Sequence, residues 1–159
     1  MATAFEQIRE IKQRKEEQAL TEARAARLAV EQAAREVEQR RQEAEAFSRE
    51  LPILQGRLYD ELEKKVCGLN DIDDVRQEVA RLRGHEASLY KKAEEAEAAR
   101  VKAIGALDAA KTAHLQSVKN VEKFNQLVEI EQTEAASQEQ AGEDKEMEEF
   151  VRLGEPADA

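Results

Sequence analysis

Apolar residues recur at alternating spacings of three and four along most of this chain, which is the pattern of helices in a coiled coil. In the first half these residues are Ala23, Ala26, Val30, Ala33, Val37, Ala44, Phe47, Leu51, Leu54 and Leu58. In the second half they are Ile72, Val75, Val79, Leu82, Leu89, Ala93, Ala96, Ala103, Leu107, Ala110, Val121, Phe124 and Val128. Each stripe is narrow, so a helix that carries one needs a partner helix to bury it. The pattern predicts two long helices packed against each other.

The stretch KKVCGLNDIDD, residues 64–74, is the strongest break in this pattern. Gly68 suits the left-handed position just past the end of a helix, with Leu69 as its hydrophobic contact. Asn70 or Asp71 is a candidate cap for the helix that follows. Because the stop and start signals lie so close together, the sequence predicts an αα-hairpin whose turn contains Gly68, Leu69, Asn70 and Asp71.

An antiparallel pair folded about residue 70 brings together residues whose numbers add to 140. The predicted pairs are Leu51 with Leu89, Leu58 with Leu82, Phe47 with Ala93, Val30 with Ala110, Ala33 with Leu107, Val37 with Ala103 and Lys12 with Val128. The heptad repeat alone would also allow sums that differ from 140 by seven or a multiple of seven, and the capping signals select 140. With arms of about 65 residues, we expect a rod roughly 95 Å long.

Three residues interrupt the stripes. Pro52 removes one helical hydrogen bond, which predicts a kink in a continuous helix or, alternatively, a break after Ser48. Arg40 and Arg100 occupy stripe positions that face each other in this register. Nearby Glu36, Glu43 and Glu97 offset them, which favours a hydrated polar layer that fixes the register over a binding site.

Composition supports an all-α fold and gives little support to catalysis. The chain has 159 residues, of which 38% are charged and 4% aromatic. Cys67 has no neighbouring His or second Cys, and the two histidines are too far apart on one arm to share a metal. His114 is expected to face Ala26 and to have only a packing role. With no pocket and no phosphate-binding glycine loop, we predict no catalytic, cofactor-binding or metal-binding residues and no enzymatic activity.

The negative charge is concentrated at the C-terminus. Residues 1–128 carry 23 Lys plus Arg against 24 Asp plus Glu, whereas residues 129–159 carry 2 against 11. No basic face or set of stacking aromatics supports nucleic-acid binding. The sequence contains no run of 18 apolar residues, so it gives no indication of membrane insertion. The N-terminus has no secretory signal. A single cysteine favours a reducing cytosol.

The apolar period fades from about Glu134. We therefore expect a helical hairpin over 1–133, with a first arm of about 3–67, a turn at 68–71 and a second arm of about 72–133, followed by an acidic, flexible tail over 134–159. Met147, Phe150, Val151 and Leu153 are spaced as a short amphipathic anchor for a partner. The alternative is a frayed tail that only aids solubility.

Positive charges gather at the open end of the predicted hairpin. Arg9, Lys12, Arg14, Lys15, Lys119 and Lys123 form a basic collar in the 140 register. Glutamates are interleaved with them: Glu6, Glu10, Glu16, Glu17, Glu122 and Glu129. The alternative is therefore an ordinary solvated face with local ion pairs.

The stretch KFNQLVEIEQTEAASQEQAGEDKEMEEF, residues 123–150, resembles the C-terminus of the YscO family of type III secretion proteins. That family has a Lys-Phe-x-x-Leu-Val start, a Glu/Gln-rich spacer and a closing Glu-Glu-Phe, matched here by Glu148, Glu149 and Phe150. Upstream, RLRGHEASLYKKAEEAE is similar to the second helix of the same family. Together with the hairpin layout, the resemblance covers roughly the whole chain.

The resemblance implies a function. YscO-like proteins, similar to the flagellar protein FliJ, are cytoplasmic central stalks that sit in the pore of the hexameric secretion ATPase. They link that ring to the export gate in the inner membrane of a Gram-negative bacterium, and some bind secretion chaperones. The resemblance to the gamma subunit of rotary ATPases suggests that the end bearing the basic collar enters the ring.

Two other classes of function remain open. One is a free cytosolic coiled-coil chaperone that exposes Val66, Leu69 and Ile72 at its turn. The other is a self-assembling scaffold that pairs through Ile104, Leu115 and Val118. A scaffold would sediment as an oligomer, whereas we expect a stalk to be a monomer when free.

Overall fold

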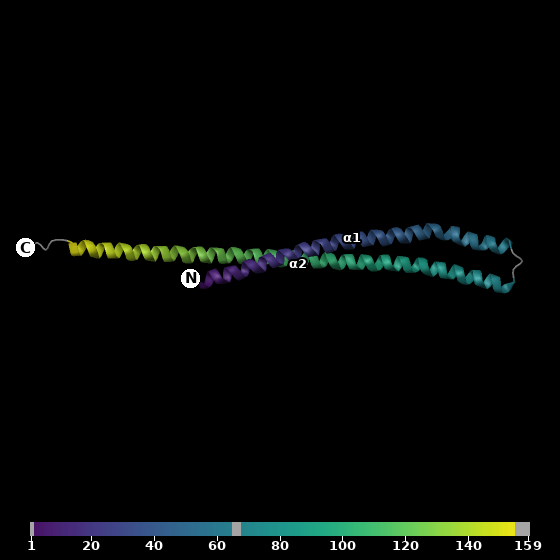
Figure 1. Ribbon diagram of the computed structural model, residues 1–159, viewed down its shortest axis with the longest axis horizontal. Coiled ribbons are helices and arrows are strands. Elements are labelled where there is room, and N and C mark those ends of the chain that lie inside the picture. Colours follow the sequence, from purple (N-terminus) through teal and green to yellow (C-terminus); the bar gives the residue numbers. More distant parts are fainter. Residues whose placement is uncertain (1, 65–67, 155–159) are drawn as a thin grey trace, which may run out of the picture. The chain divides into compact units, whose positions relative to one another are not determined.

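Nearly every residue that the structure describes is helical. The computed structural model describes residues 2–64 and 68–154 and contains two helices, α1 (Ala4–Lys64) and α2 (Leu69–Gly154) (Figure 1). They contain 61 and 86 residues, and no strand occurs within the described ranges. The predicted all-α class with two long helices is confirmed.

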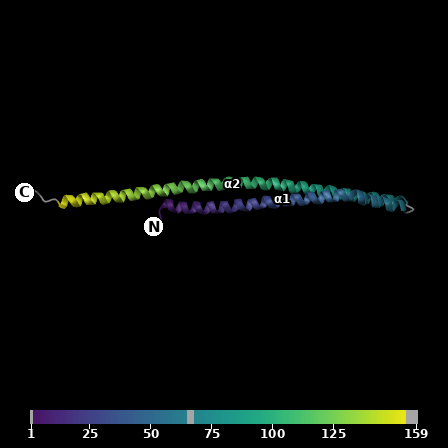
Figure 2. The ribbon, with the colours of Figure 1, turned by 90° about the horizontal axis from the view of Figure 1, so that it is seen from above.

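The chain divides into two units. The middle unit contains Glu22–Ala110, and the terminal unit contains Met1–Thr21 together with Lys111–Ala159. Within each unit, a segment of α1 lies beside an antiparallel segment of α2 (Figures 1 and 2).

The core of each unit is a narrow seam between these segments. In the middle unit the buried side chains are Val37, Ala44, Leu51, Val79, Leu82, Ala93 and Ala96, all on the predicted stripes. In the terminal unit, Val128 is 2% exposed and Ala19 is also buried, although Ala19 was outside the predicted stripe. Complete burial of a Val or Leu side chain contributes about 1.5–3 kcal/mol, so these seams supply most of the pairing energy. The predicted stripes are otherwise half-buried, except Ile72, which is exposed near the start of α2.

The register differs from the prediction by one heptad. The last residue of α1, Lys64, and the first residue of α2, Leu69, have numbers that add to 133 rather than 140. The ring of Phe47 meets the ring of His85 edge-on with centroids 4.7 Å apart, and not Ala93, which lies two helical turns further along. The predicted pairing of Phe47 with Ala93 is therefore wrong, and the middle unit follows the heptad-equivalent register in which facing numbers add to about 133.

The start of α2 explains this shift. Gly68 accepts backbone hydrogen bonds from Asp71 and Ile72, and its own N–H donates to Asp71 Oδ2 at 3.2 Å. Gly68 is therefore the N-cap of α2 rather than the left-handed residue after α1, and no described glycine has a positive φ. Leu69, Asn70 and Asp71 form the first helical turn of α2 rather than part of the loop that was predicted over residues 68–71. Residues 65–67, including Val66 and Cys67, lie outside the described residues.

Pro52 lies inside α1, which continues through it without a break. Because the register is shifted, Arg40 and Arg100 do not face each other and instead join separate ion pairs. Arg40 pairs with Glu36 at 2.8 Å and Glu43 at 3.4 Å, and its hydrogen bond to Glu36 raises the pKa of the guanidinium.

The glutamate next to Arg100 also reaches across to α1. Glu97 accepts from Arg100 at 3.2 Å and pairs with Arg41 of α1 at 3.6 Å. The predicted glutamate partners are thus confirmed, whereas the predicted single polar layer is wrong.

The second helix extends further than the sequence suggested. Burial ends at Glu131, close to the predicted boundary at 133, but α2 continues to Gly154. From 132 to 154 each residue is exposed. Glu, Gln, Ala and Lys dominate this segment and are good helix formers, so the helix persists after the apolar period has faded.

Candidate functional site

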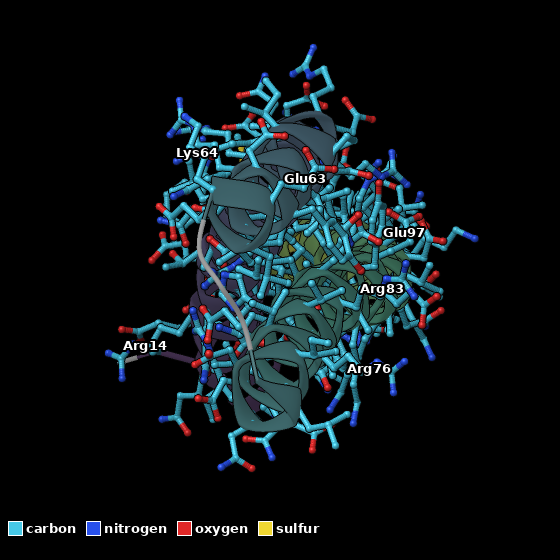
Figure 3. All side chains as sticks on the ribbon, turned by 90° about the vertical axis from the view of Figure 1, so that its right-hand side faces the viewer. Arg14, Glu63, Lys64, Arg76, Arg83 and Glu97 are labelled. Atoms are coloured by element: carbon cyan, nitrogen blue, oxygen red, sulfur yellow. The ribbon has the colours of Figure 1, made fainter. Side chains whose placement is uncertain are left out.

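All six residues of the basic collar lie in the terminal unit. Arg14, Lys15, Lys119 and Lys123 are exposed, whereas Arg9 and Lys12 are half-buried. Arg14 donates to Glu10 at 2.8 Å, and both side chains remain largely in solvent. Figure 3 shows Arg14 pointing outward, away from the helices. Exposed pairs of this kind contribute about 0–1 kcal/mol each, which leaves the charges available to a partner.

The collar surrounds the helix pair rather than forming one patch. Arg14 and Lys119 both occupy the heptad position farthest from the seam, and they lie on different helices. Their side chains therefore project in different directions. This distribution suits a partner that encloses the terminal unit better than a flat surface that docks on one side.

Lys12 has a structural role within the collar. Its Nζ lies 5.9 Å from the ring centroid of Phe124, which is a cation–π contact between α1 and α2. Because Lys12 and Arg9 are half-buried, changing them would disturb the pairing of the helices as well as the surface charge.

The terminal unit also contains contacts that the sequence analysis missed. At the start of α1, Glu6 N–H donates to Thr3 Oγ1 at 3.3 Å, and Thr3 N–H donates to Glu6 Oε2 at 3.2 Å. This is a capping box, and its signature Thr-x-x-Glu was visible in the sequence. Gln132 Nε2 of α2 donates to Glu6 Oε1 at 3.4 Å, so the same glutamate also ties the start of α1 to α2.

His114 has a different neighbour from the one predicted. Its Nε2 lies 3.4 Å from Glu16 Oε1, and both side chains are about a quarter to a third exposed. The prediction that His114 faces Ala26 followed from the 140 register and is wrong. The contact joins α1 and α2 within the terminal unit.

The predicted anchor lies in the exposed part of α2. Met147, Phe150, Val151 and Leu153 are 68%, 78%, 58% and 87% exposed. Two shallow depressions flank Met147: one is lined by Glu143, Glu146, Met147 and Phe150, and the other by Met147, Glu148, Val151 and Arg152. Leu153 lines neither depression.

Neither helix has a segment, within the described residues, that is long and apolar enough to cross a membrane. The same residues contain no group of three or more His, Cys, Asp or Glu side chains arranged to hold a metal ion.

Comparison with known proteins connects this arrangement to a family. The sequence model described as "Type III secretion protein YscO" matches residues 5–153. The chain belongs to the YscO family. The resemblance predicted from residues 123–150 is therefore confirmed, and the match includes both helices, the basic collar and the anchor residues.

A solved structure agrees with the family assignment. The crystal structure of type III secretion protein YscO from Vibrio parahaemolyticus is 26% identical in sequence, with a TM-score of 0.87. The match covers 92% of each chain. No curated protein matches this chain at a significant level. Membership of the YscO family supports a role in the type III secretion apparatus.

Proposed function

We propose that this protein is a non-enzymatic central stalk of a type III secretion export apparatus. In this proposal it works in the cytoplasm of a Gram-negative bacterium, enters the pore of the hexameric secretion ATPase and links that ring to the export gate at the inner membrane. The observation that carries the proposal is the family match over residues 5–153, which includes both paired helices and the collar. Secretion chaperones are proposed as further partners on the family resemblance alone.

The collar is proposed as the ATPase contact. A stalk that shifts inside a pore needs several weak and exchangeable contacts rather than one tight interface. Four exposed cations distributed around the terminal unit meet that requirement, because each surface pair contributes only about 0–1 kcal/mol. The attraction should weaken with added salt, since the screening length is about 10 Å at 0.1 M.

The test is a charge reversal restricted to the exposed members of the collar. Arg14, Lys15, Lys119 and Lys123 are changed to Glu, while Arg9 and Lys12 are retained because they are half-buried. We expect stimulation of ATP hydrolysis by the cognate ATPase to be lost, because the introduced glutamates would repel the ATPase surface that the native cations attract. Circular dichroism should show unchanged helicity.

A matched control separates position from net charge. It reverses four exposed cations of the middle unit, Arg24, Arg27, Lys91 and Lys92, and produces the same change in total charge. The control should retain stimulation. Equal losses in both variants would contradict the collar assignment. A loss produced only by changes at Leu69 and Ile72 would show that the opposite end enters the ring.

A further inference from the structure

The exposed part of α2 carries an apolar stripe. Phe150 and Val151 lie about 60° and 40° from Met147, on either side of it, so the three residues span about 100° of the helix surface, given 3.6 residues per turn. All three are more than half exposed. Large apolar side chains in this arrangement are the anchors by which an amphipathic helix enters a groove.

Charges are sorted around this stripe. At about 100° per residue, Glu139 and Glu146 border one side of the stripe, and Asp144 and Glu148 border the other. Glu143 lies one turn before Met147 and within the angular range of the stripe. The two basic residues of the segment 134–154, Lys145 and Arg152, lie about 140–160° from Met147, on the opposite face. Glu143 and Glu146 line one of the two depressions beside Met147, and Glu148 lines the other, which Arg152 also lines. Five carboxylates therefore surround the three apolar side chains, four beside the stripe and Glu143 at its N-terminal end.

This stripe is not a continuation of the seam. Glu131 is the last half-buried residue of α2, and it lies about 160° around the helix from Met147. The positions that would extend the seam are Ala135, Gln138, Gly142, Lys145, Glu149 and Arg152. Because these are small or polar, the segment is not designed to extend the coiled coil with another helix.

The charges around the stripe also restrict its occupant. A second copy would place one acidic frame against another, and an anionic lipid surface would be repelled in the same way. We propose that residues 139–151 dock as a helix into an apolar groove of a different protein, and that Lys and Arg side chains border that groove. This surface is separate from the collar, and the inference does not depend on the ATPase contact.

The experiment places a photoreactive p-benzoylphenylalanine at Phe150 of the full chain in secreting cells. The matched control places it at Tyr90, an exposed aromatic residue of the middle unit. We expect one protein to crosslink at 150 and not at 90. That protein is then purified, and its affinity for the full-length chain is measured by calorimetry at several salt concentrations.

Three variants test the chemistry of the contact. Met147→Ser with Phe150→Ser should weaken binding about tenfold or more, because exposed aromatic anchors are typical hot spots. Leu153→Ser should leave affinity unchanged, since Leu153 is more exposed than either residue but lies off the stripe. Neutralising the five carboxylates to Gln or Asn should weaken binding and reduce its salt dependence.

The contrary outcomes are equally specific. Absence of a crosslink at 150, or a crosslink only to a second copy or to lipid, would overturn the inference. So would an affinity that survives neutralisation of the five carboxylates. The collar reversal should leave the crosslink at 150 intact, so failure of the ATPase proposal and failure of this one are distinguishable.

Discussion

At the scale of single residues, distance from the seam decides what a side chain contributes. Leu51 and Leu28 belong to the same helix and the same unit, yet Leu51 is 7% exposed and Leu28 is 59% exposed. The residue type is identical, so the difference comes only from heptad position. Comparing substitutions at Leu51 and Leu28 therefore measures how much burial in the seam contributes to the free energy of unfolding.

We expect Leu51→Ala to lower the free energy of unfolding by about 2–4 kcal/mol, because it removes buried methyl groups and leaves a cavity between two helices. Leu28→Ala should change it by less than about 0.5 kcal/mol. Urea unfolding followed by circular dichroism measures both. Similar losses in the two variants would show that the seam does not hold the middle unit together.

Single residues also show where sequence reasoning succeeded and where it failed. The stripe positions were predictable because periodicity depends only on residue type and spacing. Gly68 was misassigned because glycine suits both a left-handed C-terminal position and an N-cap. Asp71 resolves this ambiguity, since its carboxylate accepts from Gly68 N–H as part of a cap.

At the scale of elements, the assignment of Gly68 to the end of the first helix determined the predicted register. Moving the turn by a few residues shifts every facing pair by a heptad while keeping the same stripe buried. The half-buried position of Phe47 does not reveal the register, whereas its contact with His85 does. The helical tail was missed for a related reason: loss of apolar periodicity ends burial but does not end a helix of good helix formers.

The register predicts which engineered disulfide will form. With Cys67→Ser as background, Phe47→Cys is combined with Glu86→Cys, whose position lies opposite residue 47 when facing numbers add to 133. We expect rapid crosslinking within one molecule, because facing seam residues approach the Cα separation of about 4.4–6.8 Å that a disulfide requires.

The matched control combines Phe47→Cys with Ala93→Cys in the same background. Residue 93 lies seven residues from 86, or about 10 Å along the axis, which is too far for a disulfide. Mass spectrometry of oxidised, proteolysed protein compares the two variants. Efficient bridging of 47 to 93 instead would restore the 140 register.

At the scale of the whole molecule, the seam and the exposed surface have separate roles. The seams bury the apolar stripes of both helices, whereas Arg14, Lys15, Lys119 and Lys123 of the collar and the apolar residues of the tail are exposed. The surfaces that we propose for partners therefore consist of residues whose change should cost little stability. The family could be predicted from the order of motifs, whereas the partners of each surface depend on molecules outside this chain.

The same division predicts that the free protein is a monomer. Its exposed apolar residues outside the tail occur singly, as at Leu28 and Ile53, or in short groups, such as Val101 with Ile104 and Phe5 with Ile8 and Ile11, rather than as a long second stripe. A stable interface buries at least about 1,000 Å² with good complementarity, which single residues and such short groups do not supply. The acidic segment 134–154 should add repulsion between copies.

Sedimentation velocity of the full-length chain should therefore give a single species of 17.9 kDa across micromolar concentrations. Leu115→Ser with Val118→Ser is the matched variant, because these residues belong to the alternative scaffold stripe with Ile104. The variant should sediment like the original protein. The contrary outcome is an oligomer of the original chain that this variant dissociates. The protein would then be a self-assembling scaffold, because its off-seam residues would form a stable interface.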